Sequence, residues 1–298
     1  MKKLTKILLF IVIVLIILTI YTIWDNNRVV IVEEDILVED LPKEIEGFKI
    51  LQIADLHEKE FGKNQEKLIK AINSIDYDVL ALTGDYLKSQ QSKNYAATYK
   101  VLEGLHNKEH VLFVPGNTDP APYIINNKTV VKDPFLEGLE GRGVTSLESV
   151  YKIKRSSAVV QFVNFETSIM DSQSEMLPFN ENNSSVLIAL NHYPIVDNRI
   201  DQIMENSIQT FRNYDLIIAG HYHGGQIRLP LIGALFVPEA WYKRSGLLPP
   251  QDRVKGLWQY KDTKQYVSAG LGSSNAIPFL NFRFLNTPEI NVLTLRSK

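Results

Sequence analysis

The clearest indication of the fold is the stretch Leu216-Ile217-Ile218-Ala219-Gly220-His221-Tyr222-His223-Gly224-Gly225. Its first part is a short apolar run, rich in β-branched residues and closed by a glycine, which is typical of a buried strand. Its second part places two imidazoles, His221 and His223, at alternate positions between glycines. This arrangement suits close metal coordination better than core packing. Because ligands bind beyond the carboxyl ends of strands in open α/β sheets, we predict a ligand site here.

Four other apolar runs end in the same way, at residues 50–54, 79–82, 111–114 and 186–190. The polar residues that follow these runs are Asp55 and His57, Asp85, Asn117, and His192. Each one alone has an ordinary explanation as a turn residue, a helix cap or a hydrogen-bonded core histidine. The repetition of the pattern predicts one convergent metal site.

The histidine and cysteine counts sharpen this prediction. Only six histidines occur in 298 residues, and four of them follow strand-like runs. The other two, His106 and His110, lie in a polar stretch that we interpret as an exposed connection without a role. Because the chain has no cysteine, disulfides and thiolate ligands are excluded, and oxygen and imidazole remain as ligands. That ligand set suits manganese, iron or zinc.

The composition is that of a globular protein, since 45% of the residues are apolar and 22% are charged. The length suits one large α/β domain or two small ones. No repeat and no linker rich in glycine, proline or serine divides the chain after its N-terminal segment, so we expect one domain over residues 29–298. The formal net charge of −2 provides no basic field, so nucleic acid is not expected as a partner.

The N-terminal segment, residues 1–28, is predicted to be a membrane anchor. Lysines precede an apolar run over residues 7–24, which as a helix reaches roughly 27 Å, close to the hydrocarbon thickness of a bilayer. A cleaved signal peptide is the alternative, but no small-residue cleavage site follows Trp24. A buried core helix is disfavoured because nothing polar interrupts the run. The lysines before the helix and Asp25 after it place the N-terminus in the cytoplasm and the rest outside the cell membrane.

The other elements are predicted from periodicity. A short strand is expected within residues 29–38, and helices over 64–75 and 95–105 alternate with the first three apolar runs, which makes this half βαβαβ. The later predictions are antiparallel strands within 144–166, a polar surface loop over 171–185, a helix over 199–212, and short antiparallel strands from 257 to 296.

The order and approximate spacing of the polar motifs resemble those of the calcineurin-like metallophosphoesterases. The motifs are Asp55-Leu56-His57, Gly84-Asp85, Gly116-Asn117-Thr118-Asp119, His192 and Gly220-His221-Tyr222-His223. Residues 220–226, 266–268 and 288–290 are similar to the membrane-anchored bacterial branch of that superfamily. The resemblance implies an α/β fold: a four-layer α-β-β-α sandwich with two mixed β-sheets and the site at their rim, preceded here by one transmembrane helix.

The resemblance also implies two divalent metal ions (Mn, Fe or Zn) and assigns their ligands. One metal is expected on Asp55, His57, Asp85 and His223, and the other on Asp85, Asn117, His192 and His221. Asp85 would bridge the pair, and a bridging hydroxide would attack the phosphorus in line. The residues expected to act in catalysis are Asp85, Asn117, Asp119 and His192. The implied activity is hydrolysis of a phosphoester or pyrophosphate bond.

One position departs from the family pattern. The family usually has a histidine where this chain has Thr118, and that histidine is thought to protonate the leaving oxygen while the neighbouring Asp119 orients it. Threonine is no general acid near neutral pH, so poor leaving groups should react roughly 10²- to 10⁴-fold more slowly. We therefore expect a substrate with a good leaving group, such as a pyrophosphate. Similar relatives that cleave nucleotide-lipid pyrophosphates also lack this histidine.

The segment after the glycines, residues 229–248, is unusually apolar for the rim of a site. It suits either a hairpin that completes the core or a membrane-facing lip, in which Lys243 and Arg244 meet headgroup phosphates. Together with the anchor, the second reading favours a lipid-linked phosphorylated substrate. Two alternatives stay open: an extracytoplasmic hydrolase of soluble nucleotides or phosphodiesters, and a metal-binding membrane protein without turnover.

Overall fold

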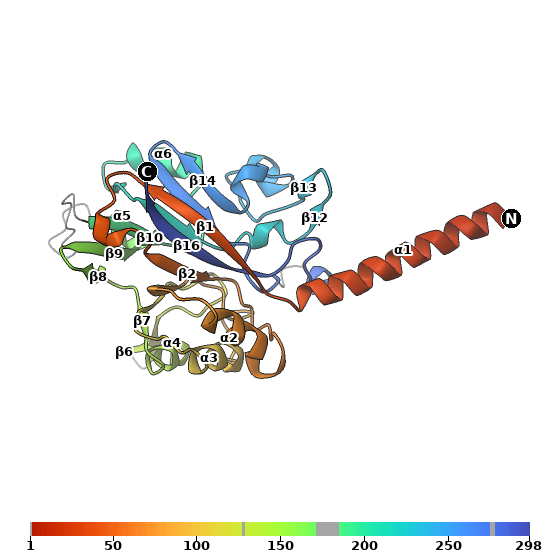
Figure 1. Ribbon diagram of the computed structural model, residues 1–298, viewed down its shortest axis with the longest axis horizontal. Coiled ribbons are helices and arrows are strands. Elements are labelled where there is room, and N and C mark those ends of the chain that lie inside the picture. The colour runs from red at the N-terminus through yellow and green to blue at the C-terminus, as the bar shows by residue number, and fades with distance from the viewer. Residues whose placement is uncertain (1, 127–128, 171–184, 275–277) are drawn as a thin grey trace.

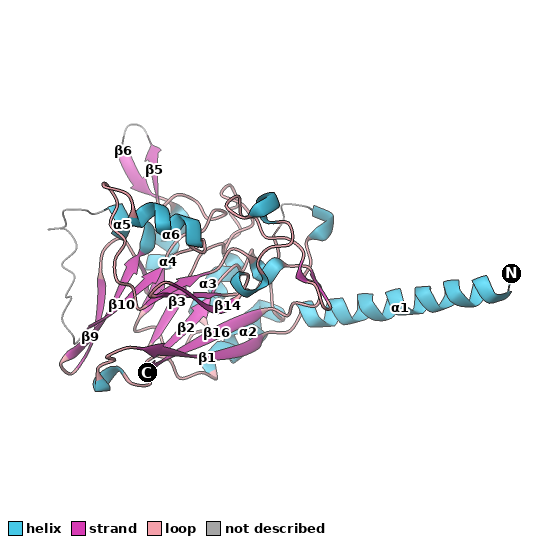
Figure 2. Cartoon of the chain, turned by 90° about the horizontal axis from the view of Figure 1, so that it is seen from above, coloured by secondary structure: helices cyan, strands magenta, loops and turns pink. Residues whose placement is uncertain are grey.

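Two stacked β-sheets and one long projecting helix make up the computed structural model, which describes residues 2–126, 129–170, 185–274 and 278–298 (Figure 1). The helix α1 (Lys2–Asn26) extends away from the sheets in both views (Figures 1 and 2). It contains the expected span, residues 7–24. Among the described residues it is the one helix long and apolar enough to cross a membrane, with a mean hydropathy of 3.0 over its most apolar window. None of that window is buried, so α1 is not packed as a core helix.

The first sheet has six strands in the order β1-β16-β2-β3-β4-β7. All neighbouring pairs are parallel except β16 with β2, so the sheet is mixed. The strand bounds are β1 (Val30–Val38), β2 (Lys49–Ile53), β3 (Val79–Leu82), β4 (Val111–Phe113), β7 (Val144–Ser146) and β16 (Glu289–Ser297).

Two strands of this sheet differ from the predictions. The tail is predicted to form short antiparallel strands. This holds for the pairing of β16 with β2, but β16 runs for nine residues and also pairs parallel with β1 along its whole length. Similarly, β7 lies in a region predicted to be antiparallel, yet it is the parallel edge neighbour of β4. Alternation along a strand reports which face is buried and carries no information about the direction of its partner.

The second sheet also has six strands, in the order β14-β15-β11-β10-β9-β8. Its central strands are parallel, and an antiparallel strand closes each edge, including the predicted hairpin of β8 with β9. The strand bounds are β8 (Tyr151–Arg155), β9 (Ala158–Asn164), β10 (Ser185–Leu190), β11 (Leu216–Ala219), β14 (Gly256–Tyr260) and β15 (Thr263–Val267).

Helices cover the outer faces of both sheets, which confirms the predicted four-layer sandwich. In Figure 1, α2, α3 and α4 lie below the sheets and α6 lies above them. On β3, Val79 and Ala81 face the second sheet, whereas Leu80 and Leu82 pack against the helices. Because both faces are buried, such strands read as continuous apolar runs in the sequence. The helices are α2 (Glu66–Asn73), α3 (Ala96–Glu103), α4 (Pro134–Glu140), α5 (Phe165–Met170) and α6 (Asp197–Met204).

The predicted helices are present but shorter. The prediction of a helix over 199–212 is wrong in its second half because α6 ends at Met204, after which Asn206 Oδ1 accepts a hydrogen bond from Ile208 N (2.7 Å). Such turns compete with continuation of a helix. The polar loop predicted over 171–185 falls almost entirely outside the described residues.

Smaller elements complete the described chain. The hairpin of β5 and β6 stands out from the body in Figure 2. The short hairpin of β12 and β13 follows the second sheet's last ligand loop. The bounds are β5 (Tyr123–Asn126), β6 (Thr129–Lys132), β12 (Arg228–Leu229) and β13 (Gly233–Ala234), with 3₁₀ turns at Lys43–Ile45, Lys63–Gln65, His223–Gly225, Lys243–Gly246, Gln251–Arg253 and Pro278–Leu280.

Candidate metal centre

The seven predicted ligands lie together at the rim between the two sheets, in the loops that follow five strands. These ligand loops carry Asp55 and His57 after β2, Asp85 after β3, Asn117 after β4, His192 after β10, and His221 and His223 after β11. Beneath the rim, Gln52 Nε2 on β2 donates a hydrogen bond to the Ala219 carbonyl of β11 (2.8 Å). This bond ties the first sheet to the second where the ligand loops meet.

The side chains form two groups that share Asp85, and in each group the possible ligand atoms lie within 4.8 Å of one another. In the first group, His57 Nε2 is 3.2 Å from His223 Nε2 and 3.5 Å from Asp85 Oδ2. In the second, His192 Nε2 is 3.3 Å from the same Asp85 Oδ2 and 3.1 Å from His221 Nδ1. A single carboxylate oxygen therefore faces both groups. Asp55 completes the first group, with Oδ1 3.8 Å from His223 Nε2, and Asn117 Oδ1 lies 3.1 Å from His192 Nε2.

The backbone of the ligand loops is unusual. Positive φ angles are uncommon for residues other than glycine and cluster at functional sites, where the surroundings hold the strain. Backbone hydrogen bonds between loops supply that support: Asp55 N donates to Gly84 O (2.9 Å) and His57 N to Asp85 O (3.0 Å). The ligands with positive φ are Asp55 (55°), His57 (47°), Asp85 (58°), His221 (68°) and His223 (49°).

Two glycines allow the loops to approach one another. A Cβ on Gly116 would lie 2.2 Å from Asp85 Oδ1, and one on Gly84 would lie 2.7 Å from His192 Nδ1. Gly84 also has a φ of +85°, which favours glycine. The Gly84-Asp85 and Gly116-Asn117 motifs thus need glycine because any side chain there would displace a ligand.

The buried carboxylate of Asp119 links two of these loops through hydrogen bonds. Its Oδ2 accepts hydrogen bonds from the backbone N–H groups of Asp85 (2.8 Å) and Gly116 (3.0 Å), and its Oδ1 accepts from those of Tyr86 (2.8 Å) and Leu87 (3.2 Å). Burial raises the pKa of Asp119 to about 6, and the nearby Asp85 charge adds to this. The carboxylate therefore fixes the backbone that delivers Asp85, a role that the sequence did not suggest.

Thr118 is engaged on the same loops. Its hydroxyl donates a hydrogen bond to the Leu87 carbonyl (2.7 Å), and its backbone N–H donates to Asp85 Oδ1 (2.8 Å). The Thr118 hydroxyl is thus used for structure, and the Asp119 carboxylate is used to bond backbone N–H groups.

The electrostatics of the rim place a proton on His192. Burial alone would lower the pKa of His192, but the Asp85 carboxylate outweighs it and raises that pKa to about 9. Burial would raise the pKa of Asp85, and the positive charge of His192 instead holds it below its usual range. Burial raises the pKa of Asp55 to about 7. Burial, with the His192 charge, lowers the pKa of His221 to about 3.

The donor set fits divalent cations. Burial lowers the pKa of both His57 and His223, so both rings are neutral near pH 7 and offer lone pairs. His192 Nδ1 lies 2.9 Å from the Thr83 carbonyl, and this contact orients Nε2 toward Asp85, as outer hydrogen bonds do for imidazoles that bind metals. Carboxylate, amide and imidazole donors without thiolates suit manganese, iron or zinc.

The apolar segment, residues 229–248, borders this rim and has one buried side and one exposed side. Ala234 and Val237 are buried against Tyr222, between the two rim histidines of β11, so the inner side of the segment belongs to a small core. Trp241 and Leu247 on its outer side remain 46% and 47% exposed. The segment thus supports the His221 loop and also offers apolar surface to solvent.

Two contacts of the histidines were not anticipated from the sequence. Tyr193 packs its ring against His221 at 4.4 Å between centroids and is 41% exposed, so it lies at the mouth of the site. Its position directly after His192 was the available signal. His110, expected to be solvated, is only partly exposed, with Nδ1 2.9 Å from the Tyr151 hydroxyl, and it belongs to neither ligand group.

A rim of this kind, with a shared carboxylate between two ligand groups, is typical of enzymes that use two metal ions, and phosphoesterases are among them. The calcineurin-like phosphoesterase family model matches residues 48–225, more than half of the chain. The chain belongs to this family, as its motifs predicted, and is a metal-dependent phosphoesterase. Members of the family use divalent metals.

Several curated proteins are similar to the chain over most of its length. The uncharacterized metallophosphoesterase YkuE of Bacillus subtilis is 26% identical over 264 residues, which cover 86% of this chain and 82% of the relative. The UDP-2,3-diacylglucosamine pyrophosphatase LpxG of Chlamydia muridarum is 25% identical, with 85% and 86% covered. The phosphodiesterase YaeI of Escherichia coli is 27% identical, with 83% and 82% covered.

Proposed function

We propose that the protein is a membrane-anchored phosphohydrolase that holds two divalent cations and cleaves a phosphoester or pyrophosphate bond of a lipid-linked substrate. The single observation that carries the chemistry is the position of Asp85 Oδ2, which lies 3.5 Å from His57 Nε2 in one group and 3.3 Å from His192 Nε2 in the other. The first cation would bind Asp55, His57, Asp85 and His223, and the second would bind Asp85, Asn117, His192 and His221.

The residues of the site set the positions of the two ligand groups and the net charge that faces the substrate. Two divalent cations bound there would supply an activated water at neutral pH and neutralise charge on the phosphoryl oxygens. Asp85 keeps the two groups adjacent, and the neutral amide of Asn117 with four imidazoles limits the negative charge that faces an anionic substrate. Asp119 fixes the loop of Asp85 through four backbone N–H groups. Because Asp85, Asp119 and the four imidazoles are buried, little reorganisation of these side chains is needed when the substrate binds.

The type of leaving group that we propose is inferred from the side chain of Thr118. Its hydroxyl is already committed to the Leu87 carbonyl, and a threonine does not give up a proton as a general acid near pH 7. A pyrophosphate leaves as a phosphate monoester anion and needs no such proton, whereas an alkyl alcohol does. The chlamydial relative's name, a UDP-2,3-diacylglucosamine pyrophosphatase, supports this assignment.

The apolar surface beside the site supports a lipid-linked substrate. In Figure 1, β12 and β13 lie on the side of the body from which α1 projects. Leu231, in the turn between them, is fully exposed, and Phe279 is 81% exposed. Phe284 N donates to Gln226 O (3.0 Å), so the segments that carry these side chains lie next to one another. A substrate that stays in the bilayer could reach the rim across this surface.

Hydrolysis by the full-length protein in detergent micelles tests the proposal. Three substrates separate its parts: a UDP-linked diacyl sugar, the same UDP-sugar without acyl chains, and an alkyl phosphodiester, each with a manganese, iron and zinc series. We expect fastest turnover of the acylated pyrophosphate, and none for Asp85→Ala. Faster cleavage of the alkyl ester would reject the leaving-group argument, and faster cleavage of the unacylated sugar would indicate a soluble substrate. Metal binding without any turnover would reject the enzyme.

We further propose that residues 1–28 form the anchor and that residues 29–298 form a catalytic domain outside the cell membrane. The chain has no cysteine, so a single cysteine introduced at an exposed position reports its own location. Leu37→Cys should react with a membrane-impermeant maleimide in intact cells, since Leu37 is 47% exposed on β1. Labelling only after lysis would place the domain in the cytoplasm.

A further inference from the structure

A fully buried arginine lies beneath the first ligand group. Arg283 has no exposed surface, and its guanidinium makes no hydrogen bond to a carboxylate among the described residues. Burial lowers the pKa of Arg283 to about 10, and the charges of Glu289, Asp55 and Asp25 offset only part of that cost, so the buried guanidinium needs a specific reason to be there. The guanidinium donates instead to four backbone carbonyls, those of Asn286 (2.8 Å), Gly272 (2.8 Å), Ala269 (2.7 Å) and His223 (3.2 Å).

One of these carbonyls, that of His223, belongs to a loop of the first group, and that of Gly272 lies in a segment bonded to another such loop. The His223 carbonyl also accepts a hydrogen bond from Asn286 Nδ2 (2.6 Å), so the peptide after this ligand is held from two sides. Gly272 N donates to the carbonyl of Asp55 (2.6 Å), which connects the guanidinium to the loop of a second ligand. His223 itself has a φ of 49°, a strained conformation that persists where the surroundings hold the backbone, as these two hydrogen bonds do.

The end of the anchor helix is hydrogen-bonded to the backbone of the same arginine. Asn26, the last residue of α1, donates from Nδ2 to the Arg283 carbonyl (2.7 Å) and accepts at Oδ1 from the Arg283 backbone N–H (2.8 Å). The adjacent Asp25 accepts a hydrogen bond from the Thr287 hydroxyl (2.8 Å). Figure 1 shows the C-terminal part of the chain, in dark blue, meeting the base of α1. The contacts join segments 257 residues apart in sequence.

We propose that Asn26 and Arg283 form a clasp that couples the anchor helix to the metal centre: Arg283 is a positioning residue for His223, and Asn26 positions Arg283. The clasp rests on the proposed function in that it acts on the first ligand group. An apolar side chain would fill the same space at lower cost in desolvation, so the four carbonyl contacts are the reason for a guanidinium. The attachment of the helix to the domain thereby becomes part of the geometry of the site.

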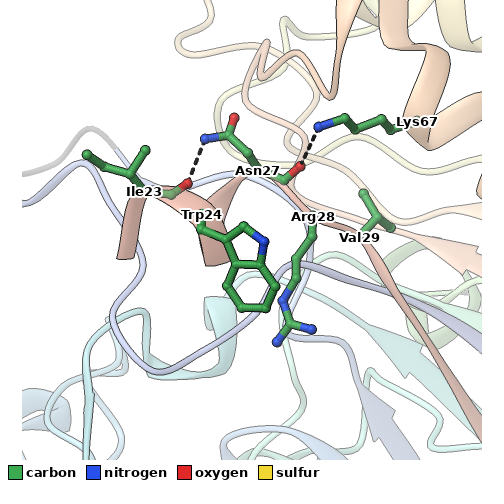
Figure 3. A pocket seen from close by; sticks show the side chains of 6 residues that line it. All are labelled: Ile23, Trp24, Asn27, Arg28, Val29 and Lys67. Carbon is green, nitrogen blue, oxygen red and sulfur yellow. Dashed lines mark hydrogen bonds between the residues drawn. The ribbon is translucent and has the colours of Figure 1, made fainter. Parts of the chain in front are cut away.

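The test compares Asn26→Ala with Asn27→Ala in the full-length protein in detergent micelles. Asn27 is the matched control because its side chain donates only back to the Ile23 carbonyl of the same helix (2.7 Å; Figure 3). Titration calorimetry with Mn²⁺ should show weaker binding for Asn26→Ala by about three- to tenfold, the effect of losing hydrogen bonds at an outer position. The kcat should fall while KM changes little, because the substrate contacts are untouched.

Arg283→Lys provides a second variant, since a single ammonium group cannot reach four carbonyls and should weaken Mn²⁺ binding about 10- to 100-fold. Thermal unfolding in a chelator checks that each variant is folded, and Asn26→Ala alone decides the matter if Arg283→Lys is not. Equal Mn²⁺ affinity and kcat for Asn26→Ala and Asn27→Ala would overturn the clasp while leaving the proposed function intact. A wild-type protein that binds no divalent cation would overturn both.

Discussion

The ligand loops and the apolar segment lie side by side at the rim, but they are held in different ways. The loops bury six of their seven candidate ligands, are cross-linked by backbone hydrogen bonds, and have a positive φ at five of the seven. The apolar segment has strands of only two residues and leaves large side chains such as Leu231 and Trp241 in solvent. We therefore expect displacements of the ligand loops to be costly, and we expect the apolar segment to accommodate different contacts.

This difference separates chemistry from substrate choice. Positions of ligand atoms must be kept within a fraction of an ångström, which requires supporting contacts on every side. Surface that receives an apolar chain needs only area and accessibility. Substitutions in the loops should therefore reduce reaction on every substrate, and substitutions in the segment should change the ratio between substrates.

The largest effect is expected for Asp85→Asn. The amide keeps the size of the side chain and can still accept the hydrogen bond from Thr118 N, but it removes the charge that both ligand groups share. Losing several kcal/mol of charge stabilisation should lower kcat/KM at least about a thousandfold on all substrates. Steady-state kinetics measures this, with thermal unfolding as the control for folding. Retention of a tenth of wild-type activity would show that Asp85 is not shared by two cations.

Gly116→Ala should be the next most damaging. Its Cβ would lie 2.2 Å from Asp85 Oδ1 and 2.4 Å from Asp85 N, so the ligand must move. We expect a loss of roughly 100-fold in kcat, as for displacements of about 1 Å at reacting groups. Gly143→Ala is the matched control: its φ is +88° but nothing lies within 4 Å of the new Cβ. That variant should lose about 1 kcal/mol of stability and keep its activity, and equal losses of activity in both would argue against the contact.

The sequence was sufficient for the parts of this rim that depend on local pattern. Asp85 and His192 follow runs whose every residue is apolar, and the ends of parallel strands converge by topology, so the gathering of these side chains at one rim could be predicted from their order and spacing. The direction of the strands at the edge of the first sheet could not be predicted from the sequence. The strands β1 and β16 are separated by more than 250 residues, and nothing in either strand specifies a parallel partner.

The contacts that support the ligand loops also could not be predicted from the sequence. Asn26 looks like the end of a membrane helix, and Arg283 looks like a surface residue, until the fold places them together and buries the guanidinium. The same holds for Asp119, which was expected to orient a proton donor and instead accepts four backbone N–H groups. Contacts of this kind depend on the packing of loops that are distant in sequence, for which periodicity offers no signal.

Metal affinity should rise with pH. His192 has a pKa of about 9 and Asp55 one of about 7, so at pH 7 His192 holds a proton that a cation must displace and Asp55 is about half protonated. Between pH 7 and 9 the affinity for Mn²⁺ should increase up to about tenfold per pH unit, measured by calorimetry in buffers of different ionisation enthalpy. The stability of the metal-free protein, measured in a chelator, should change in the opposite direction and fall as pH rises. The pKa of folded His192 lies above its ordinary value of 6.5, so the stabilising pair of His192 with Asp85 is fully present below pH 6.5 and is lost as pH rises through 9. Affinity that does not vary with pH would show that no proton is displaced.

The smallest effect, and the one that tests the other side of the comparison, is expected for Trp241→Ser and Leu247→Ser. Each removes an apolar group that is about half exposed, which at ~25 cal/mol per Å² should weaken use of an acylated substrate by roughly three- to tenfold. Turnover of the unacylated UDP-sugar should stay at the wild-type rate, because the ligand loops are unchanged. Leu37→Ser is the matched control, since Leu37 is also 47% exposed but lies on the edge strand β1. Equal losses on acylated and unacylated substrates would mean that the segment serves only to support the His221 loop.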